Sequence, residues 1–227
     1  MVKVIGHNDY LSKIVKRYRN RLIVTLTAYP FALSMALFYP QIIPAVAIGL
    51  TLITVKFVKL CGKFIKYRKG IKGEIKVEKA LSKLDDSYIL INNVRLPNGN
   101  GNIDHVVIGP TGVFAIETKN IRGNFICEGD EWYKIKNGRV RKIRSISRQA
   151  KQNAYNLRKF LRKHGCDQFV HCLVVLTNKD CKVDLINPSV PVVGVENLTR
   201  FIMNANTHLS QKKIHEIVGI IVTRTNI

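Results

Sequence analysis

The sequence predicts an α/β domain with a mixed sheet flanked by helices, preceded by an N-terminal hydrophobic helical hairpin. Three observations predict it. Residues 22–55 contain no charged residue and lie between clusters of lysine and arginine. From residue 73 onward the hydrophobic pattern follows the order helix, three strands, helix, strand, which is typical of an α/β domain. The strand segments are rich in β-branched residues and are separated by glycine, proline and asparagine.

The charge-free stretch is long enough to enter a membrane. A continuous helix of its length would exceed the hydrocarbon core of about 30 Å, and Pro40 and Pro44 interrupt it near its middle. We therefore expect two short spans joined near Tyr39, Pro40 and Gln41, with both basic flanks in the cytoplasm under the positive-inside rule. The alternatives are a re-entrant or interfacial hairpin, a single tilted span and a buried helical hairpin of a soluble core.

The chain divides into four expected segments, because its 227 residues suffice for one globular domain with an appendage. They are a basic N-terminal segment (1–21), a membrane-anchoring hydrophobic hairpin (22–58), a basic connector (59–72) and a soluble domain (73–227) that faces the cytoplasm. The connector could lie along anionic lipid headgroups. Gly70 and Gly73 are expected to end it.

The soluble domain is expected to begin with a helix that ends near Leu84, because residues 74–81 repeat apolar side chains at helical spacing. Three strands should follow, at Tyr88–Val94, Ile103–Ile108 and Val113–Thr118. A ribbon comes next, with turns at Gly129-Asp130 and Asn137-Gly138 and strands near residues 125–127, 132–135 and 140–143.

A second helix is expected after the ribbon, with Ser147 as its N-cap. Its apolar stripe comprises Ala150, Ala154, Leu157 and Leu161. The remaining expected elements are a strand covered on both faces at 169–176, a short strand at 190–193, and helices near 196–204 and 210–222.

The formal net charge of +22, from 37 Lys and Arg against 15 Asp and Glu, favours a polyanionic partner. Nucleic acid and anionic lipid both qualify, and a solvated basic surface without a partner is the alternative. The five cysteines are scattered without a CxxC pair, which argues against a zinc site or a disulfide framework and favours a reducing compartment.

A hairpin that turns at residues 109–112 would bring two carboxylates together. If Gly109 faces Gly112, Asp104 lies directly opposite Glu117. Alternation along the strand then places Lys119 on the same face as Glu117. A slip of one residue would send one carboxylate to the opposite face.

Two opposed carboxylates destabilise a sheet unless a positive or neutral group lies between them, so the pair calls for a cation. Hard divalent ions such as Mg²⁺ or Mn²⁺ take one or two carboxylates together with substrate phosphate. Asp104, Glu117 and the backbone carbonyl of Thr118 would form such an open site, with Lys119 stabilising the attacking hydroxide. The alternative is an exposed surface pair of Glu117 and Lys119.

These residues belong to a longer block that resembles the nuclease-related domain (NERD) family of the PD-(D/E)XK restriction-endonuclease-like superfamily. The resemblance covers about residues 73–161 and includes Gly73-Glu74, the stretches 102–114 and 116–120, Gly123, Trp132, Gln149, Asn153 and Leu157. Ile103 precedes Asp104 where the superfamily motif has proline.

The resemblance implies a restriction-endonuclease-like mixed sheet and a set of site residues. It makes Asp104 and Glu117 metal-ligand candidates and Lys119 the catalytic lysine. Glu74 matches an acidic residue of the first helix, and its alternative role is a favourable interaction with the helix dipole. Gln149 matches a polar residue on the helix after the core strands, where it could also merely be solvated.

Other candidates concern the ribbon and the reverse face of the sheet. His105 should point to that face as a core histidine. Trp132 and Tyr133 could stack on bases or pack on the sheet. A basic run on the ribbon and the following helix could contact phosphates; it comprises Lys134, Lys136, Arg139, Arg141, Lys142, Arg144 and Arg148.

The sequence and the resemblance together predict a membrane-anchored, Mg²⁺- or Mn²⁺-dependent nuclease, a hydrolase of phosphodiester bonds in nucleic acid, with DNA favoured over RNA as the substrate. A nuclease-like module that binds nucleic acid at the membrane without cutting is the second hypothesis. A membrane-associated interaction protein, whose basic surface meets lipid, is the third.

Overall fold

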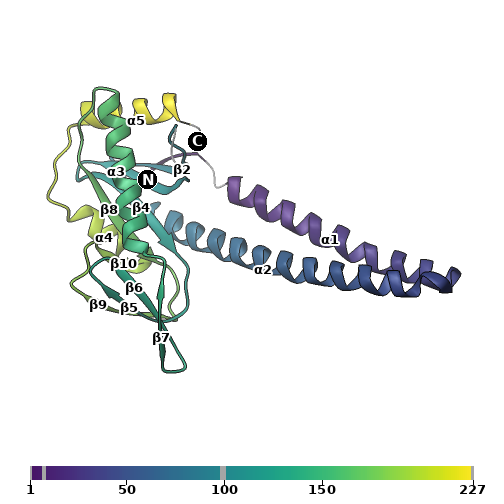
Figure 1. Ribbon diagram of the computed structural model, residues 1–227. Helices are drawn as coiled ribbons and strands as arrows, with labels where there is room; N and C mark the ends of the chain where they lie inside the picture. Colours follow the sequence, from purple (N-terminus) through teal and green to yellow (C-terminus); the bar gives the residue numbers. More distant parts are fainter. Residues whose placement is uncertain (1, 7–8, 98–100, 226–227) are drawn as a thin grey trace. The chain divides into compact units, whose positions relative to one another are not determined.

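The computed structural model describes residues 2–6, 9–97 and 101–225. The chain separates into two units, one formed by residues 9–71 and the other by residues 1–8 together with 72–227. Figure 1 shows a long helical hairpin in the first unit and a layered α/β domain in the second. The α/β class with flanking helices and a preceding apolar helical region is therefore confirmed.

The hairpin consists of helix α1 (Asp9–Phe38), a 3₁₀ turn η1 (Pro40–Ile42) and helix α2 (Ile43–Leu81). The turn lies where the two prolines predicted it, because proline has no N–H and suits the first turn of a helix. Tyr29 and Thr54 share a hydrogen bond of 2.9 Å between the helices. Tyr18 and Tyr67 stack with ring centroids 5.4 Å apart.

Helix α2 does not stop at the basic connector. The sequence predicted a break near Gly70 and Gly73 before a separate first helix, and this is wrong, because α2 continues through both glycines to Leu81. A glycine inside a helix costs only about 1 kcal/mol relative to alanine. The many lysines and apolar residues around the two glycines favour the helix and offset that cost.

Two helical stretches, Ser12–Phe38 and Pro40–Leu81, are long and apolar enough to cross a membrane. Their most apolar windows have a mean hydropathy of 1.5 and 1.9 and are not buried within the protein. Length and composition are therefore compatible with membrane association. The exposure argues against the alternative of a buried helical hairpin in a soluble core.

The larger sheet has six strands in the order β1-β2-β3-β4-β8-β10. They are β1 (Lys3–Ile5), β2 (Ile89–Val94), β3 (Ile103–Gly109), β4 (Gly112–Lys119), β8 (Val170–Leu176) and β10 (Val192–Gly194). The sheet is mixed, because β2, β3 and β4 run antiparallel whereas β1 is parallel to β2 and β8 is parallel to β4 and β10. Strand β1 was not predicted, since three residues carry no periodicity.

Both faces of this sheet are covered. Helices α3 (Ile146–Lys163) and α5 (Gln211–Arg224) pack on one face around buried residues such as Leu157, Ile217 and Val106. The C-terminal turns of α2 and helix α4 (Leu198–Met203) pack on the other, where Leu81 and Ile202 join the same cluster. Figure 1 shows α3 running along the strands beside β4 and β8. The face under α3 also carries Asp104 and Glu117.

A second sheet of four strands has the order β7-β6-β5-β9. It contains β5 (Gly123–Glu128), β6 (Glu131–Lys136), β7 (Arg139–Ile143) and β9 (Cys181–Ile186). The ribbon strands β5 to β7 were predicted. Strand β9 was missed, because its side chains are mostly exposed and its parallel pairing with β5 is a contact between distant segments.

The cap of α3 is Ser145 rather than the expected Ser147. The Ser145 hydroxyl oxygen accepts a hydrogen bond from the backbone N–H of Arg148 at 3.0 Å. Ser147 is buried instead, and its hydroxyl accepts a 2.8 Å hydrogen bond from Nε1 of Trp132. Trp132 therefore fixes the start of α3 against the second sheet. A short helix η2 (Val195–Asn197) precedes α4, and Ser210 caps α5 as expected.

Candidate active site

The β3–β4 hairpin has the register that the sequence predicted. Gly109 pairs with Gly112, and the ladder continues to His105 and Ile116. The next step of the same register opposes Asp104 and Glu117. At that step the Asp104 carboxylate itself accepts the backbone N–H of Thr118 at 2.8 Å. The hairpin therefore brings the two carboxylates together at its open end.

Glu117 is almost fully buried, with 2% of its surface exposed, and each of its oxygens accepts a hydrogen bond from a side chain. The ammonium group of Lys119 donates to Oε1 at 2.5 Å. The amide of Asn153, on α3, donates to Oε2 at 2.9 Å. Lys119 also donates to Oε1 of Gln149 at 3.2 Å. Helix α3 thus supplies two amide side chains that hold the carboxylate and the lysine in place.

Glu74 joins this group from the C-terminal part of α2. Its close approach depends on Gly73, where an added Cβ would lie 2.9 Å from Cβ of Asn120 and 3.1 Å from the hydroxyl of Thr177. Any larger residue at position 73 would push the helix away from the end of β4. The Glu74 side chain is buried and feels the charges of Glu117 and Lys119.

Burial raises the pKa of all three carboxyl groups, and the charge of Glu117 raises the pKa of Asp104 and Glu74 further. Burial raises the pKa of Asp104 well above its ordinary value, and the charges of Glu117 and Glu74 raise it further. Burial also raises the pKa of Glu117, against the opposing effect of Lys119, Arg144 and Asn153. Burial followed by repulsion from Glu117 raises the pKa of Glu74 to about 7. The cluster therefore has an excess of negative charge that a cation would relieve.

The donor types suit a hard divalent cation. Within the described part of the chain, no group of three or more His, Cys, Asp or Glu side chains converges as a metal cage. An open pair of carboxylates is nevertheless the ligand set that Mg²⁺ or Mn²⁺ takes when substrate phosphate completes the coordination. Asp104 and Glu117 fit that pattern. The hydroxyl of Thr118 is buried without a hydrogen-bond partner among the described residues.

A cleft of about 560 Å³ lies beside this group. Gln149 and Asn153, which hold Lys119 and Glu117, form part of its wall, and Asn102 forms another part. Lys142, Arg144 and Arg148 give the cleft a positive charge. The arrangement places cations next to the carboxylate cluster, where a phosphate chain could enter.

The predicted basic run divides between two faces of the β6–β7 ribbon. Directly opposed residues of an antiparallel pair share a face, and Lys134 pairs with Arg141 as Lys136 pairs with Arg139. These four share the face of Trp132. By alternation along β7, Lys142 projects from the other face, and both Lys142 and Arg144, which follows the end of β7, line the cleft. The run is therefore not one continuous surface.

The cations of the cleft are partly neutralised by Glu131, which the sequence reasoning did not single out. Glu131 forms ion pairs with Lys142, at 2.6 Å, and with Arg148. Arg144 forms no ion pair among the residues that the structure describes, and its charge acts on Glu117. It therefore has the best placement of the three for an incoming phosphate. No local pattern in the sequence distinguishes it from its basic neighbours.

Two of the ring-bearing candidates, His105 and Trp132, are core residues. His105 is fully buried on the reverse face, its Nδ1 donates to Oδ1 of Asn92 at 2.7 Å, and burial lowers its pKa to about 3. It is therefore neutral at physiological pH, as expected of a core histidine. Trp132 is fully buried as well, which favours packing over base stacking. Tyr133 is half-buried on the ribbon.

Comparison with known proteins identifies one matching family. Residues 69–177 match the model of the nuclease-related domain family. A stretch of 65 residues, 27% of the chain, is 46% identical to an uncharacterized protein of Bacillus anthracis. The match spans 31% of that relative's length, so the chain covers less than a third of it. No solved structure matches the chain.

Proposed function

Through residues 69–177 the chain belongs to the nuclease-related domain family of the restriction-endonuclease-like superfamily. We propose that it is a membrane-anchored nuclease that hydrolyses phosphodiester bonds in DNA with the help of Mg²⁺ or Mn²⁺. One observation carries this proposal: the carboxylates of Asp104 and Glu117 and the ammonium of Lys119 meet at the open end of one hairpin, beside a cleft with basic walls.

The residues of the chain have distinct roles in this proposal. Asp104, Glu117 and the Thr118 carbonyl would hold the cation, which when bound would supply positive charge to offset the charge that develops on the phosphate. Glu74 would tune the negative charge of the cluster. These assignments rest on the effect of Glu117 on the pKa of Asp104 and Glu74 and on the hard oxygen donors of the carboxyl groups.

Lys119 would stabilise the negative charge that develops during phosphodiester cleavage. Its ammonium is held by Glu117 and Gln149, so little reorganisation is needed when substrate arrives. Asn153 fixes the other oxygen of Glu117 and keeps that carboxylate oriented. Gln149 and Asn153 thus act as positioning residues for Lys119 and Glu117.

The cleft would bind the nucleic-acid backbone. Arg144 and Arg148 line it, and guanidinium groups pair well with phosphate. Such contacts carry no base information, so the binding would be insensitive to sequence and sensitive to salt. The wide positive surface of the chain would draw DNA in from solution.

The helical hairpin would anchor the domain at the cytoplasmic face of a membrane. Two apolar helices joined at Pro40, with basic residues at both outer ends, support this part of the proposal. An impermeant thiol reagent can test it with a cysteine introduced at position 41. Labelling from outside the cell is expected for two full spans, whereas protection would indicate a re-entrant hairpin.

A non-catalytic nuclease-like module is the second candidate, because the same basic cleft would bind DNA without cutting it. The buried carboxylate pair favours the enzyme, since a binding module gains nothing from repelling charges next to its phosphate site. The test is incubation of the full chain, purified in neutral detergent, with plasmid and linear DNA or RNA in Mg²⁺ or Mn²⁺. Cleavage that requires Asp104 supports the nuclease, and tight binding without cleavage supports the module.

A further inference from the structure

A basic pocket lies within the helical hairpin, far along the sequence from the nuclease-like site. Of the residues that the structure describes, nine line it, all from α1 and α2: Lys13, Lys16, Arg17, Asn20, Arg21, Val24, Thr25, Lys56 and Leu60. These described lining residues include five cations and no carboxylate. Its charge and its position between two helices call for an anionic ligand.

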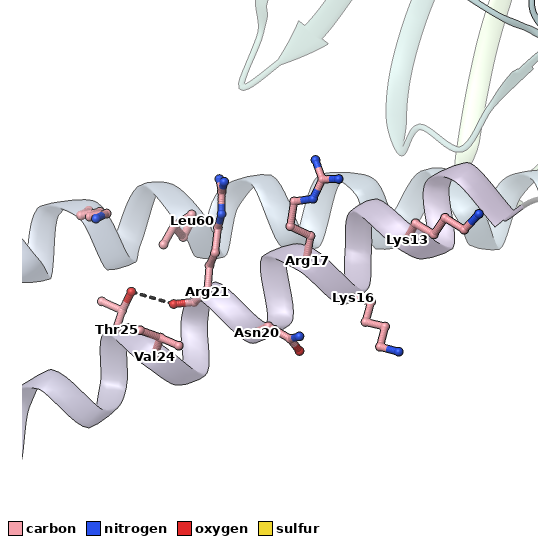
Figure 2. A pocket seen from close by; sticks show the side chains of 9 residues that line it. Lys13, Lys16, Arg17, Asn20, Arg21, Val24, Thr25 and Leu60 are labelled. Atoms are coloured by element: carbon pink, nitrogen blue, oxygen red, sulfur yellow. Dashed lines mark hydrogen bonds between the residues drawn. The ribbon is translucent and has the colours of Figure 1, made fainter.

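The cations of α1 form a stripe. Lys13, Arg17 and Arg21 are spaced four residues apart, so they lie above one another on one face of the helix. Figure 2 shows the side chains of Arg17 and Arg21 extending in the same direction, while Lys16 extends the opposite way. The stripe is about 12 Å long at the helical rise of about 1.5 Å per residue. That length exceeds a single phosphate and suits a headgroup with two.

The pocket lies at the boundary of the charge-free stretch. Arg21 is the last charged residue before residues 22–55 and Lys56 is the first one after them, and both line the pocket. From the turn at Pro40 to either residue, the helices extend about 24–28 Å at the usual helical rise. This distance approaches the hydrocarbon thickness of about 30 Å. In a hairpin that enters a membrane, the pocket would therefore lie at the depth of the headgroups.

The apolar part of the lining distinguishes a lipid from other anions. Val24 and Leu60 belong to the pocket along with the cations; Val24 lies within the charge-free stretch, and Leu60 follows Lys56 and Lys59 on α2. A phospholipid can place its phosphate against the arginines and its acyl chains against these apolar side chains. A nucleic-acid backbone offers no apolar chain for them.

Two contacts between α1 and α2 hold the walls of the pocket together. The Tyr18–Tyr67 stack lies toward the basic ends of the helices, and the Tyr29–Thr54 hydrogen bond lies within the charge-free stretch. Along the chain, the pocket residues from Arg21 to Thr25 lie between these two contacts. The hydroxyl of Thr25 donates a hydrogen bond to the backbone carbonyl of Arg21 at 2.7 Å, so its proton is already used within α1.

We propose that this pocket binds the headgroup of an anionic phospholipid with two phosphates, held by Arg17, Arg21 and Lys56 with acyl chains against Val24 and Leu60. The inference rests on the membrane anchor of the proposed function and is independent of nuclease activity. A bound lipid would fix the depth of the hairpin in the membrane.

Native mass spectrometry of the full chain in neutral detergent, titrated with cardiolipin, tests the proposal. A triple variant, Arg17→Gln, Arg21→Gln and Lys56→Gln, is expected to weaken cardiolipin retention at least about 30-fold. The matched control is Arg19→Gln, Lys59→Gln and Lys63→Gln, which removes the same charge from exposed positions outside the pocket. The control variant should retain cardiolipin within about threefold of the unmodified chain. Equal retention by both triple variants would overturn the proposal.

Further measurements distinguish a lipid from other anionic ligands and test the membrane anchor by itself. Inorganic phosphate that displaces cardiolipin at equal concentration would assign the pocket to a free anion, and loss of binding to a short DNA duplex in the pocket variant alone would assign it to nucleic acid. Either result overturns the lipid proposal. Flotation with phosphatidylcholine vesicles tests the anchor separately. Failure to float would overturn both, whereas flotation with equal cardiolipin retention by the two variants would leave the anchor intact and reject the pocket.

Discussion

The ammonium nitrogen of Lys119 lies 2.5 Å from Oε1 of Glu117, two residues earlier on the same strand. Side chains two residues apart on a strand share a face, so β4 alone is sufficient to bring this pair together. The partners of the pair come from elsewhere. Asn153 and Gln149 reach it from α3, and Asp104 comes from β3.

The first prediction concerns Lys119. Replacing it with methionine in Lys119→Met should reduce DNA cleavage at least about 100-fold, because a cation directed at the developing negative charge is lost. Plasmid nicking by the full chain measures the effect. Lys212→Met removes an exposed lysine on α5 and should leave cleavage unchanged. Equal rates for the two variants would remove Lys119 from the mechanism.

The second prediction concerns Glu74 and pH. Its pKa is raised from 4.5 to about 7, so the folded state binds its proton more tightly than the unfolded state does. The resulting stability is present below pH 4.5 and is lost as the pH rises through about 7. Glu74→Gln should therefore stabilise the metal-free protein above pH 7, by at most about 3 kcal/mol, and should have little effect near pH 4.

Urea denaturation in EDTA at a series of pH values measures this difference in the free energy of unfolding. Asp86→Asn provides the control, since Asp86 is exposed. This variant removes one carboxylate from the surface without touching the cluster. A flat pH profile for Glu74→Gln would contradict the carboxylate cluster. Added Mg²⁺ should reverse the preference, because a cation favours the charged form of Glu74.

The third prediction separates the two faces of the basic ribbon. Arg144→Gln removes a cation from the cleft and should weaken DNA binding. The number of counterions released on binding, measured from the salt dependence of the affinity, should fall by about one. Arg139→Gln removes the same charge from the opposite face of the ribbon, at a residue that does not line the cleft. Fluorescence anisotropy at several salt concentrations distinguishes them. Equal losses would mean that the basic run acts as a diffuse surface.

The fourth prediction concerns Trp132, the only tryptophan of the chain. Because it is buried and donates to Ser147, Trp132→Phe should reduce the free energy of unfolding by about 1–3 kcal/mol and leave DNA affinity unchanged. Its fluorescence should resist quenching by acrylamide. Tyr133→Phe keeps the ring of a half-buried neighbour, so it should leave both the free energy of unfolding and the DNA affinity unchanged. A loss of DNA affinity in Trp132→Phe would restore base stacking as its role.

The fifth prediction concerns the N-terminal strand. Val2 is buried, and its N–H donates to the carbonyl of Leu84 at 3.0 Å, so the first residues belong to the nuclease-like unit. Val2→Asp should destabilise that unit by about 2–4 kcal/mol, because it buries a charge. Val4→Asp, at a position in β1 that is 40% exposed, should have a much smaller effect. Thermal unfolding of the full chain compares them.

Two features of this protein could be predicted from the sequence because local chemistry decides them. Pro40 lacks an N–H and suits a turn, so the tip of the hairpin follows from the chain itself. Gly109 and Gly112 set the turn of the β3–β4 hairpin, and the turn sets the register that opposes Asp104 and Glu117. The residue types at that end then indicated the chemistry, with help from the family block.

Other features were decided only by contacts between distant segments. The pairing of β1 with β2 joins residues separated by more than eighty positions, and no periodicity in three residues could indicate it. The basic run looked continuous in the sequence, but the turn at Asn137-Gly138 and the pleat of β7 divide it between two faces. The reach of Gln149 and Asn153 to Lys119 and Glu117 likewise depends on how α3 packs on the sheet, because the orientation of a helix is fixed by its buried face rather than by its polar residues.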